Sequence, residues 1–180
     1  MEGRVRIVRV LAAVGIDAAQ APAVNEWLSF GYDQQRSGWN SVETGLSPAN
    51  VGKMKLLWSS QLPLTPQDTA LSTLTSPLVA QVNGKTLVFT IGIDDTLFAI
   101  DGDSGKTVWQ KSFPNSLKPV RPATSNCANT EQATPVIDKK RGVIYFTTSD
   151  GKLRGADLAD GAEKLAPMPF VAPFSRNWSL

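Results

Sequence analysis

The most informative segment of the sequence is Ala99-Ile100-Asp101-Gly102-Asp103-Ser104-Gly105-Lys106-Thr107-Val108-Trp109. It has the pattern A-x-D-x-x-[ST]-G-x-x-x-W. Asp101 can accept backbone hydrogen bonds across a turn, and Gly105 supplies a residue that tolerates a positive φ. Ala99 is small enough for a flat ring to pack beside it, and Trp109 can wedge between neighbouring sheets. The stretch predicts two strands joined by a tight turn, with a docking tryptophan on the second strand.

The chain around this stretch consists of short β-rich runs that end at Gly, Pro, Asp or Asn. Examples are residues 87–91, 96–100 and 143–148, and no long helical periodicity follows residue 24. Regularly spaced short strands are typical of β-sandwiches, barrels and propellers. The pattern predicts an all-β protein.

An internal repeat decides among these folds. Ser76-Pro77-Leu78-Val79 aligns with Thr134-Pro135-Val136-Ile137 at an offset of 58, and Asp101 and Gly105 align with Asp157 and Gly161 at an offset of 56. A small length change inside a hairpin turn explains the difference. The second copy keeps the Asp and the Gly but has no tryptophan. Self-similarity at such a period is the signature of a repeat architecture.

Each repeat is predicted to hold four antiparallel strands, with Asn83-Gly84 and Asp150-Gly151 as hairpin dipeptides. A four-stranded unit repeated roughly every 50–60 residues is a β-propeller blade. The predicted strands are 77–82, 86–91, 96–101 and 107–113 in the first blade, and 135–139, 142–149, 152–157 and 163–165 in the second.

A trace of another blade comes earlier in the chain. Trp58 and Pro63 align with Trp109 and Pro114 at an offset of 51, so residues 55–62 are predicted to be the outer strand of a preceding blade. Its other strands are not found in the sequence before it. Seven or eight blades of this size need roughly 400–480 residues. The sequence is therefore expected to be the N-terminal fragment of a longer ring: residues 55–180 form a partial propeller, with blades near 75–114 and 133–170, and the start of another blade near 170–180.

The 99–109 motif resembles the tryptophan-docking motif of quinoprotein dehydrogenases, whose cofactor is pyrroloquinoline quinone (PQQ). Trp27, Gly31 and Asp33, followed by Asn50-Val51 and Leu57-Trp58, resemble the opening of PQQ-type alcohol and polyvinyl alcohol dehydrogenases. The resemblance runs from about residue 27 to the end. It implies a structural blade-docking role for Ala99, Asp101, Gly105, Trp109, Trp58, Asp157 and Gly161.

The resemblance also implies a function. It indicates an exported oxidoreductase that oxidises an alcohol or a sugar with PQQ and a divalent metal, calcium. The family's carboxylate base and metal ligands match no stretch of this sequence, so no catalytic, cofactor-binding or metal-binding residue is assigned. The alternative is a non-catalytic propeller that serves as a binding or assembly scaffold, because the docking motif serves both. The W-x3-G-x-D segment at Trp27 favours the dehydrogenase, and no lipobox cysteine lies near the N-terminus.

Cys127 is the single cysteine of the chain. PQQ alcohol dehydrogenases carry an adjacent Cys-Cys pair near the cofactor, whereas Asn126 and Ala128 flank Cys127 here, so that disulfide cannot form. A lone cysteine in an exported protein suggests a disulfide to a segment elsewhere.

Composition excludes several other functions. The 180 residues include no histidine, which rules out Ser-His-Asp and Cys-His catalysis and His-ligated zinc or haem within these residues. A net charge of +2 gives no reason to expect nucleic acid as a partner. A small-molecule substrate and the missing C-terminal blades of the same chain are the expected partners.

The first residues have the order of an export signal. Arg4, Arg6 and Arg9 precede an apolar run from Val10 to Ile16, and small residues follow. Cleavage is expected after residue 23, which makes 1–23 a signal peptide and 24–54 a lead-in segment. Residues 1–25 are then expected to be unpacked or an isolated helix, and the mature protein to be periplasmic or secreted. The alternative is a short amphipathic or disordered leader. No other apolar run approaches the roughly 20 residues of a membrane span.

Other candidate sites are judged structural. The 101–105 loop fails the EF-hand pattern, because Lys106 stands where glycine is required and Ser112 where glutamate belongs. Asp94-Asp95 is expected to be a solvated hairpin tip rather than a metal site. Asn177-Trp178-Ser179 is a glycosylation sequon only in form. The roles of three tryptophans stay open: Trp27, Trp39 and Trp178.

Overall fold

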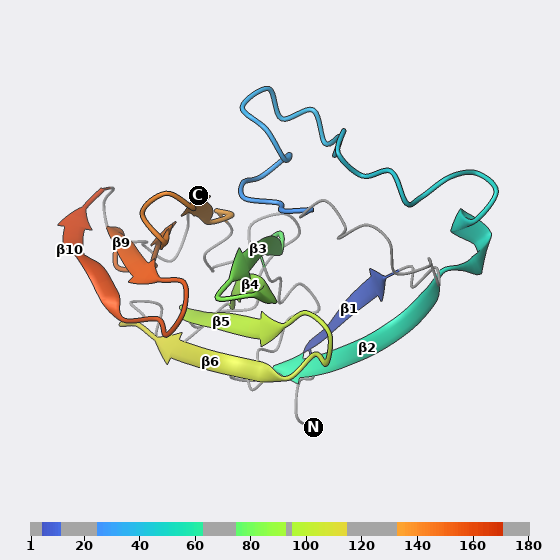
Figure 1. The fold of residues 1–180 in the computed structure, drawn as a ribbon. Coiled ribbons are helices and arrows are strands. Elements are labelled where there is room, and N and C mark those ends of the chain that lie inside the picture. Colours follow the sequence, from blue (N-terminus) through green and yellow to red (C-terminus); the bar gives the residue numbers. More distant parts are fainter. Residues whose placement is uncertain (1–4, 12–24, 63–74, 93–94, 115–132, 171–180) are drawn as a thin grey trace, which may run out of the picture.

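A computed structural model describes residues 5–11, 25–62, 75–92, 95–114 and 133–170. Two four-stranded sheets form its body, and every pair of neighbouring strands is antiparallel (Figure 1). The first sheet has the order β3 (Leu78–Val82), β4 (Lys85–Ile91), β5 (Thr96–Asp101), β6 (Thr107–Ser112). The second has the order β7 (Val136–Asp138), β8 (Val143–Thr147), β9 (Lys152–Asp157), β10 (Glu163–Pro169).

The all-β prediction is confirmed, and the two sheets are consecutive propeller blades. Seven of the eight strands match their predicted ranges within two residues at either end, whereas β10 continues to Pro169 instead of ending at 165. Within the described residues the only helix is one 3-10 turn, η1 (Val51–Lys53). None of the described helices has the length and apolarity needed to cross a membrane.

The core lies between the two sheets. Phe89 and Ala99 of the first sheet are fully buried in one cluster with Ile144, Phe146 and Ala156 of the second. Apolar side chains therefore fill the space between the blades, and their removal from water is the main favourable term in joining them. The blades pack face to face, as the repeat predicts.

The offset change of the repeat lies in the first hairpin of the blade. Val136 pairs with Tyr145 where Leu78 pairs with Phe89, so the offset is 58 between β3 and β7 but 56 between β4 and β8. The later strands keep the offset of 56, because Leu87 pairs with Asp101 and Val143 with Asp157. The two-residue difference in length therefore lies in the first hairpin, between β3 and β4 in the first blade and between β7 and β8 in the second. The next turn, which leads into β5 or β9, has the same length in both blades.

The other face of the first sheet is covered by β2 (Lys55–Leu62). Trp58 and Leu62 of β2 are buried against Val88, Phe98 and Ile100. Figure 1 shows β2, β6 and β10 in one arc along the outer side of the sheets. This is the place of an outer strand of a preceding blade, as predicted for residues 55–62.

The expectation for residues 1–25 is wrong over residues 5–11. These residues form β1 (Val5–Leu11), which pairs antiparallel with β2 from Val5↔Leu62 to Leu11↔Lys55. The expectation that no partner strand of β2 precedes it is wrong for the same reason. A strand with a free edge presents unpaired N–H and C=O groups, and a run rich in Val and Ile favours the extended conformation that satisfies them.

Candidate functional site

The two ends of the sheets differ in their connections. At one end, called the turn end, short turns join β3 to β4, β5 to β6, β7 to β8 and β9 to β10. At the other, called the connection end, lie the β4–β5 turn (92–95) and the β8–β9 turn (148–151), together with the starts of β3 and β7. The long connection from β6 to β7 leaves from the connection end, where Phe113 N donates to Asp95 O (3.0 Å). Long loops on a rigid scaffold are where binding residues concentrate.

Trp58 lies against the β5–β6 turn at the turn end. Its indole Nε1 donates to the carbonyl of Gly102 (2.9 Å), and the ring covers Gly105 so closely that a Cβ there would lie 2.6 Å from ring carbons Cδ2 and Cε3. Gly105 also has a φ of +72°. Two independent reasons, space and backbone conformation, therefore require glycine at this position.

Trp109 makes the same contact one blade later. Its Nε1 donates to the carbonyl of Leu158 (3.2 Å), and a Cβ on Gly161 would lie 2.9 Å from the ring. Trp109 pairs directly with Ala99, and its ring packs at 5.9 Å from that of Phe89. The ring is half-buried rather than mostly buried. The blade-docking role of Trp109 stays a prediction.

Asp101 organises the turn that Trp58 covers. Its Oδ1 accepts hydrogen bonds from Ser104 Oγ (2.7 Å), Ser104 N (2.8 Å) and Asp103 N (3.2 Å). These bonds, with those of the Ser104 side chain largest, lower the pKa of Asp101 below its ordinary value near 3.8. In the second blade the pKa of Asp157 is lowered first by the backbone N–H of Ala159, which donates at 2.7 Å.

The lowered pKa values of these two carboxylates predict how the stability of the fold depends on pH. Because the folded pKa values of Asp101 and Asp157 lie below the unfolded value, the unfolded chain takes up protons first as the pH falls. Stability should be constant above about pH 5 and decline below about pH 4. Urea unfolding across this range checks it, and Asp101→Asn should flatten the decline. An unfolding midpoint for the unmodified chain that is unchanged down to about pH 3 would contradict the assignment.

The second blade carries no docking tryptophan of its own. Leu165 stands at the position that Trp109 occupies in the first blade, and it packs over Gly155, where a Cβ would lie 2.9 Å from the Leu165 Cβ. Pro167 and Pro169 lie on the same strand, β10, and proline lacks the N–H that would extend the sheet. The outer strand of the second blade is thus built differently from β6.

The lead-in segment joins the inner edges of both blades. Trp27 pairs with Val79 of β3 through two backbone bonds (2.8 and 2.9 Å), and Leu28 O accepts from Ile137 N of β7 (2.8 Å). Glu26 Oε1 accepts from Gln81 N (2.8 Å) and forms an ion pair with Lys139 (2.9 Å).

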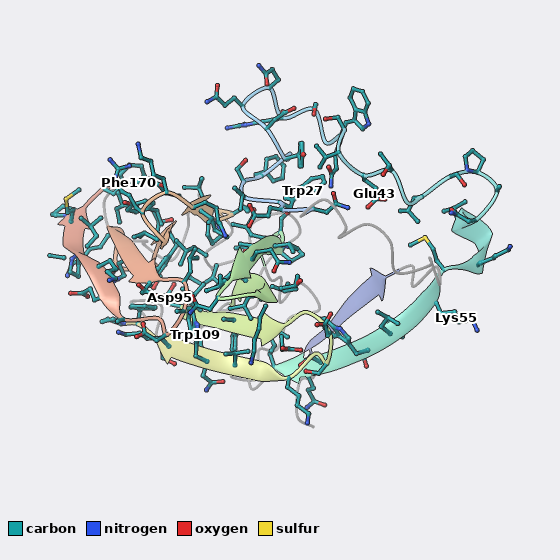
Figure 2. All side chains as sticks on the ribbon, viewed as in Figure 1. Trp27, Glu43, Lys55, Asp95, Trp109 and Phe170 are labelled. Carbon is teal, nitrogen blue, oxygen red and sulfur yellow. The ribbon has the colours of Figure 1, made fainter. Side chains whose placement is uncertain are left out.

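These contacts give Trp27 a structural role, which the sequence left open, whereas Trp39 is 71% exposed. Figure 2 shows Trp27 beside the inner strands, on a segment that arches over the sheets before it reaches β2.

The solvated position expected for Asp94-Asp95 is wrong for Asp95. Asp95 is fully buried, although it precedes β5 at a hairpin turn, and Figure 2 places it between the sheets. Its Oδ1 accepts from Ser149 N (3.1 Å), and its Oδ2 from Ser149 Oγ. The second blade covers the turn, which the sequence around the turn does not reveal. Asp94 lies outside the described residues.

A second buried polar group lies beside this contact. Arg154 of β9 is 5% exposed. Its Nη2 donates to Asp150 Oδ2 (2.7 Å), its Nε donates to Thr148 Oγ1 (2.9 Å), and its guanidinium lies 5.2 Å from the ring of Phe113. Despite the burial of Asp150, which acts to raise its pKa, the hydrogen bonds and charge supplied by Thr148 and Arg154 leave that pKa lowered.

The described residues hold no group of three or more His, Cys, Asp or Glu side chains placed to bind a metal ion. Cys127, the sequon at Asn177 and Trp178 lie outside the described residues, as does the segment 171–180 predicted to begin another blade. No described residue is therefore assigned to calcium or PQQ.

Residues 27–166 match the family described as the PQQ β-propeller domain of glucose, ethanol and alcohol dehydrogenases. A search of curated proteins found no match.

Solved structures show the same fold. The quinohemoprotein alcohol dehydrogenase ADHIIG from Pseudomonas putida HK5 matches 82% of this chain, with a TM-score of 0.60 and 20% identity. The quinohemoprotein alcohol dehydrogenase from Comamonas testosteroni matches 81% of it, with a TM-score of 0.56 and 20% identity. BamB from Moraxella catarrhalis matches 62% of this chain and 27% of its own, at 21% identity and a TM-score of 0.40, too low to support an argument. The chain spans 19% of the length of each dehydrogenase.

Proposed function

Because this chain belongs to the family of PQQ β-propeller domains of glucose, ethanol and alcohol dehydrogenases, we propose that it is the N-terminal part of a quinoprotein oxidoreductase. Its reaction would transfer two electrons and two protons from the H–C–OH group of an alcohol or a sugar to PQQ, which would leave a carbonyl product. The observation that carries the proposal is the family match over residues 27–166. Fold similarity at 20% identity supports the architecture and says nothing of the substrate.

We further propose that additional blades of the same protein complete a ring of seven or eight. The dehydrogenases with this fold are much longer than this chain, which covers 19% of each. A propeller binds its ligand on the central axis, where loops from all blades converge. In this proposal, the connection end contributes its two turns to that site. The order of basic, apolar and small residues at 4–23 supports export to the periplasm or the medium. Cleavage after residue 23 would remove β1 and leave β2 without this partner strand.

PQQ and calcium belong to this proposal through the family alone. The described residues offer no cluster that could hold the metal, so none of them is assigned as a metal ligand, base or cofactor contact. Two charged groups near the connection end, Asp95 and Arg154, form hydrogen bonds with residues of the 148–151 turn, which contains Asp150. These groups are therefore proposed to have a structural role at this end of the sheets.

The test compares the complete reading frame with this segment. The complete protein, reconstituted with PQQ and calcium, should bind PQQ in a calorimeter and reduce an artificial dye with at least one member of an alcohol and sugar panel. Saturable binding and turnover would support the oxidoreductase. A folded complete protein that binds no PQQ would reject it and favour the non-catalytic scaffold.

Residues 24–180 alone should neither bind PQQ nor reduce the dye. Two blades supply only a fraction of the loops around the axis, and the absence of histidine leaves no alternative triad in this segment. The same calorimetric and dye assays check this prediction. Robust, saturable dye reduction by the segment would show that the site lies within it.

A further inference from the structure

Asp95 occupies a position whose backbone conformation favours glycine. Its φ is 59°, in the left-handed region that few residues other than Gly, Asn and Asp adopt. The backbone is fixed on both sides, because Asp95 N donates to Gly92 O (3.1 Å) and Asp95 O accepts from Phe113 N (3.0 Å). A glycine would satisfy these backbone bonds at lower conformational cost, so the reason for an aspartate must lie in its side chain.

The side chain crosses from one blade to the other. Both carboxylate oxygens bond to Ser149, one to its backbone N–H and one to its hydroxyl, and neither residue is exposed to solvent. Burying a carboxylate is costly unless hydrogen bonds replace its hydration. A buried carboxylate that meets donors of a turn 54 residues away in the sequence constrains where that turn lies.

The contact is not part of the repeated blade. Gly92 N donates to Thr96 O in the first blade and Thr148 N to Lys152 O in the second, which aligns the two turns residue by residue. Gly151, with a φ of 76°, then stands where the first blade has Asp95. Ile93 stands in the sequence where the second blade has Ser149. Within the two described blades the pair therefore does not repeat.

We propose that Asp95 and Ser149 form an inter-blade latch that fixes the β8–β9 turn against the first blade at the connection end. Arg154 holds the same turn from within its own blade through Thr148 and Asp150. The two blades thereby present one rigid surface at this end. The inference is independent of the proposed oxidoreductase activity, since a scaffold protein would need the same rigidity there.

Amide hydrogen exchange in the intact protein tests the latch. Asp95→Gly removes the carboxylate while relieving the positive φ, and Ser149→Ala removes one of the two donors. Each should speed exchange at residues 149–152 by about tenfold or more, with amides of β4 and β5 unchanged. Asp95→Asn can still accept from Ser149 N and donate to its hydroxyl, so it should restore most of the protection. Asn83→Gly is the matched control, because Asn83 has a φ of 50° at an exposed turn.

A double variant and two contrary outcomes complete the test of the latch. In the double variant Asp95→Gly/Ser149→Ala, exchange should be no faster than in Asp95→Gly. The Asp95→Gly substitution already removes both hydrogen bonds of the pair, so Ser149→Ala has no further bond to remove. Exchange at 149–152 that stays at the unmodified rate in Ser149→Ala and Asp95→Gly would overturn the latch, and so would fully additive effects. If Asp95→Gly does not fold, Ser149→Ala and Asp95→Asn decide the question by themselves.

Discussion

In the complete protein, replacing Trp109 with alanine is expected to lower the free energy of unfolding by about 3–5 kcal/mol. The substitution removes a ring that packs on Phe89 and covers Gly161, and it leaves the carbonyl of Leu158 without the indole N–H. Trp109 belongs to the first blade, whereas Leu158 and Gly161 belong to the second. The substitution therefore weakens the interface between the two blades. Urea unfolding followed by circular dichroism measures the change.

Trp39→Ala is the matched control for this prediction. Trp39 is 71% exposed, so its removal should change stability by less than about 0.5 kcal/mol. Equal effects of the two substitutions would show that Trp109 does not dock the blades.

Gly105→Ala is expected to lower the free energy of unfolding by about 3 kcal/mol. Two contributions add at this residue, one from backbone conformation and one from steric crowding. A left-handed φ costs an L-residue about 1–2 kcal/mol, and inserting a methyl group into a packed site costs about 1–3 kcal/mol. The new Cβ would lie 2.6 Å from ring carbons of Trp58, whose indole is held by its bond to Gly102, so the ring cannot yield without losing that bond. The urea midpoint again reports the change.

Gly84→Ala separates the two sources. Gly84 has a φ of +76°, close to that of Gly105, but no heavy atom lies within 4 Å of the position that a Cβ would take there. Gly84→Ala should therefore lower the free energy of unfolding only by the cost of the left-handed backbone conformation, about 1–2 kcal/mol. A Gly105→Ala variant no less stable than Gly84→Ala would show that the contact with Trp58 contributes nothing.

Strands, turns and the docking stretch could be predicted from the sequence because local chemistry specifies them. Asn83-Gly84 adopts positive φ at both residues, and the D-x-x-x-G spacing from Asp101 to Gly105 forms the expected bonded turn. The repeat supplied the one long-range fact, since two copies of one pattern must fold alike. Even the lack of a tryptophan in the second copy was visible, and Leu165 stands in its place.

Local sequence patterns specify the eight blade strands, most of their turns and the resemblance to a family. Packing of the two sheets specifies which polar groups meet across the blades. The residues around Asp95 predict a solvated tip, yet the second blade buries it against Ser149. Glu26 has no local signal at all, yet it meets Gln81 on β3 of the first blade and Lys139 in the β7–β8 turn of the second. The physical reason is that periodicity and turn propensity act between neighbours along the chain, whereas burial depends on surfaces that come together only when the sheets pack.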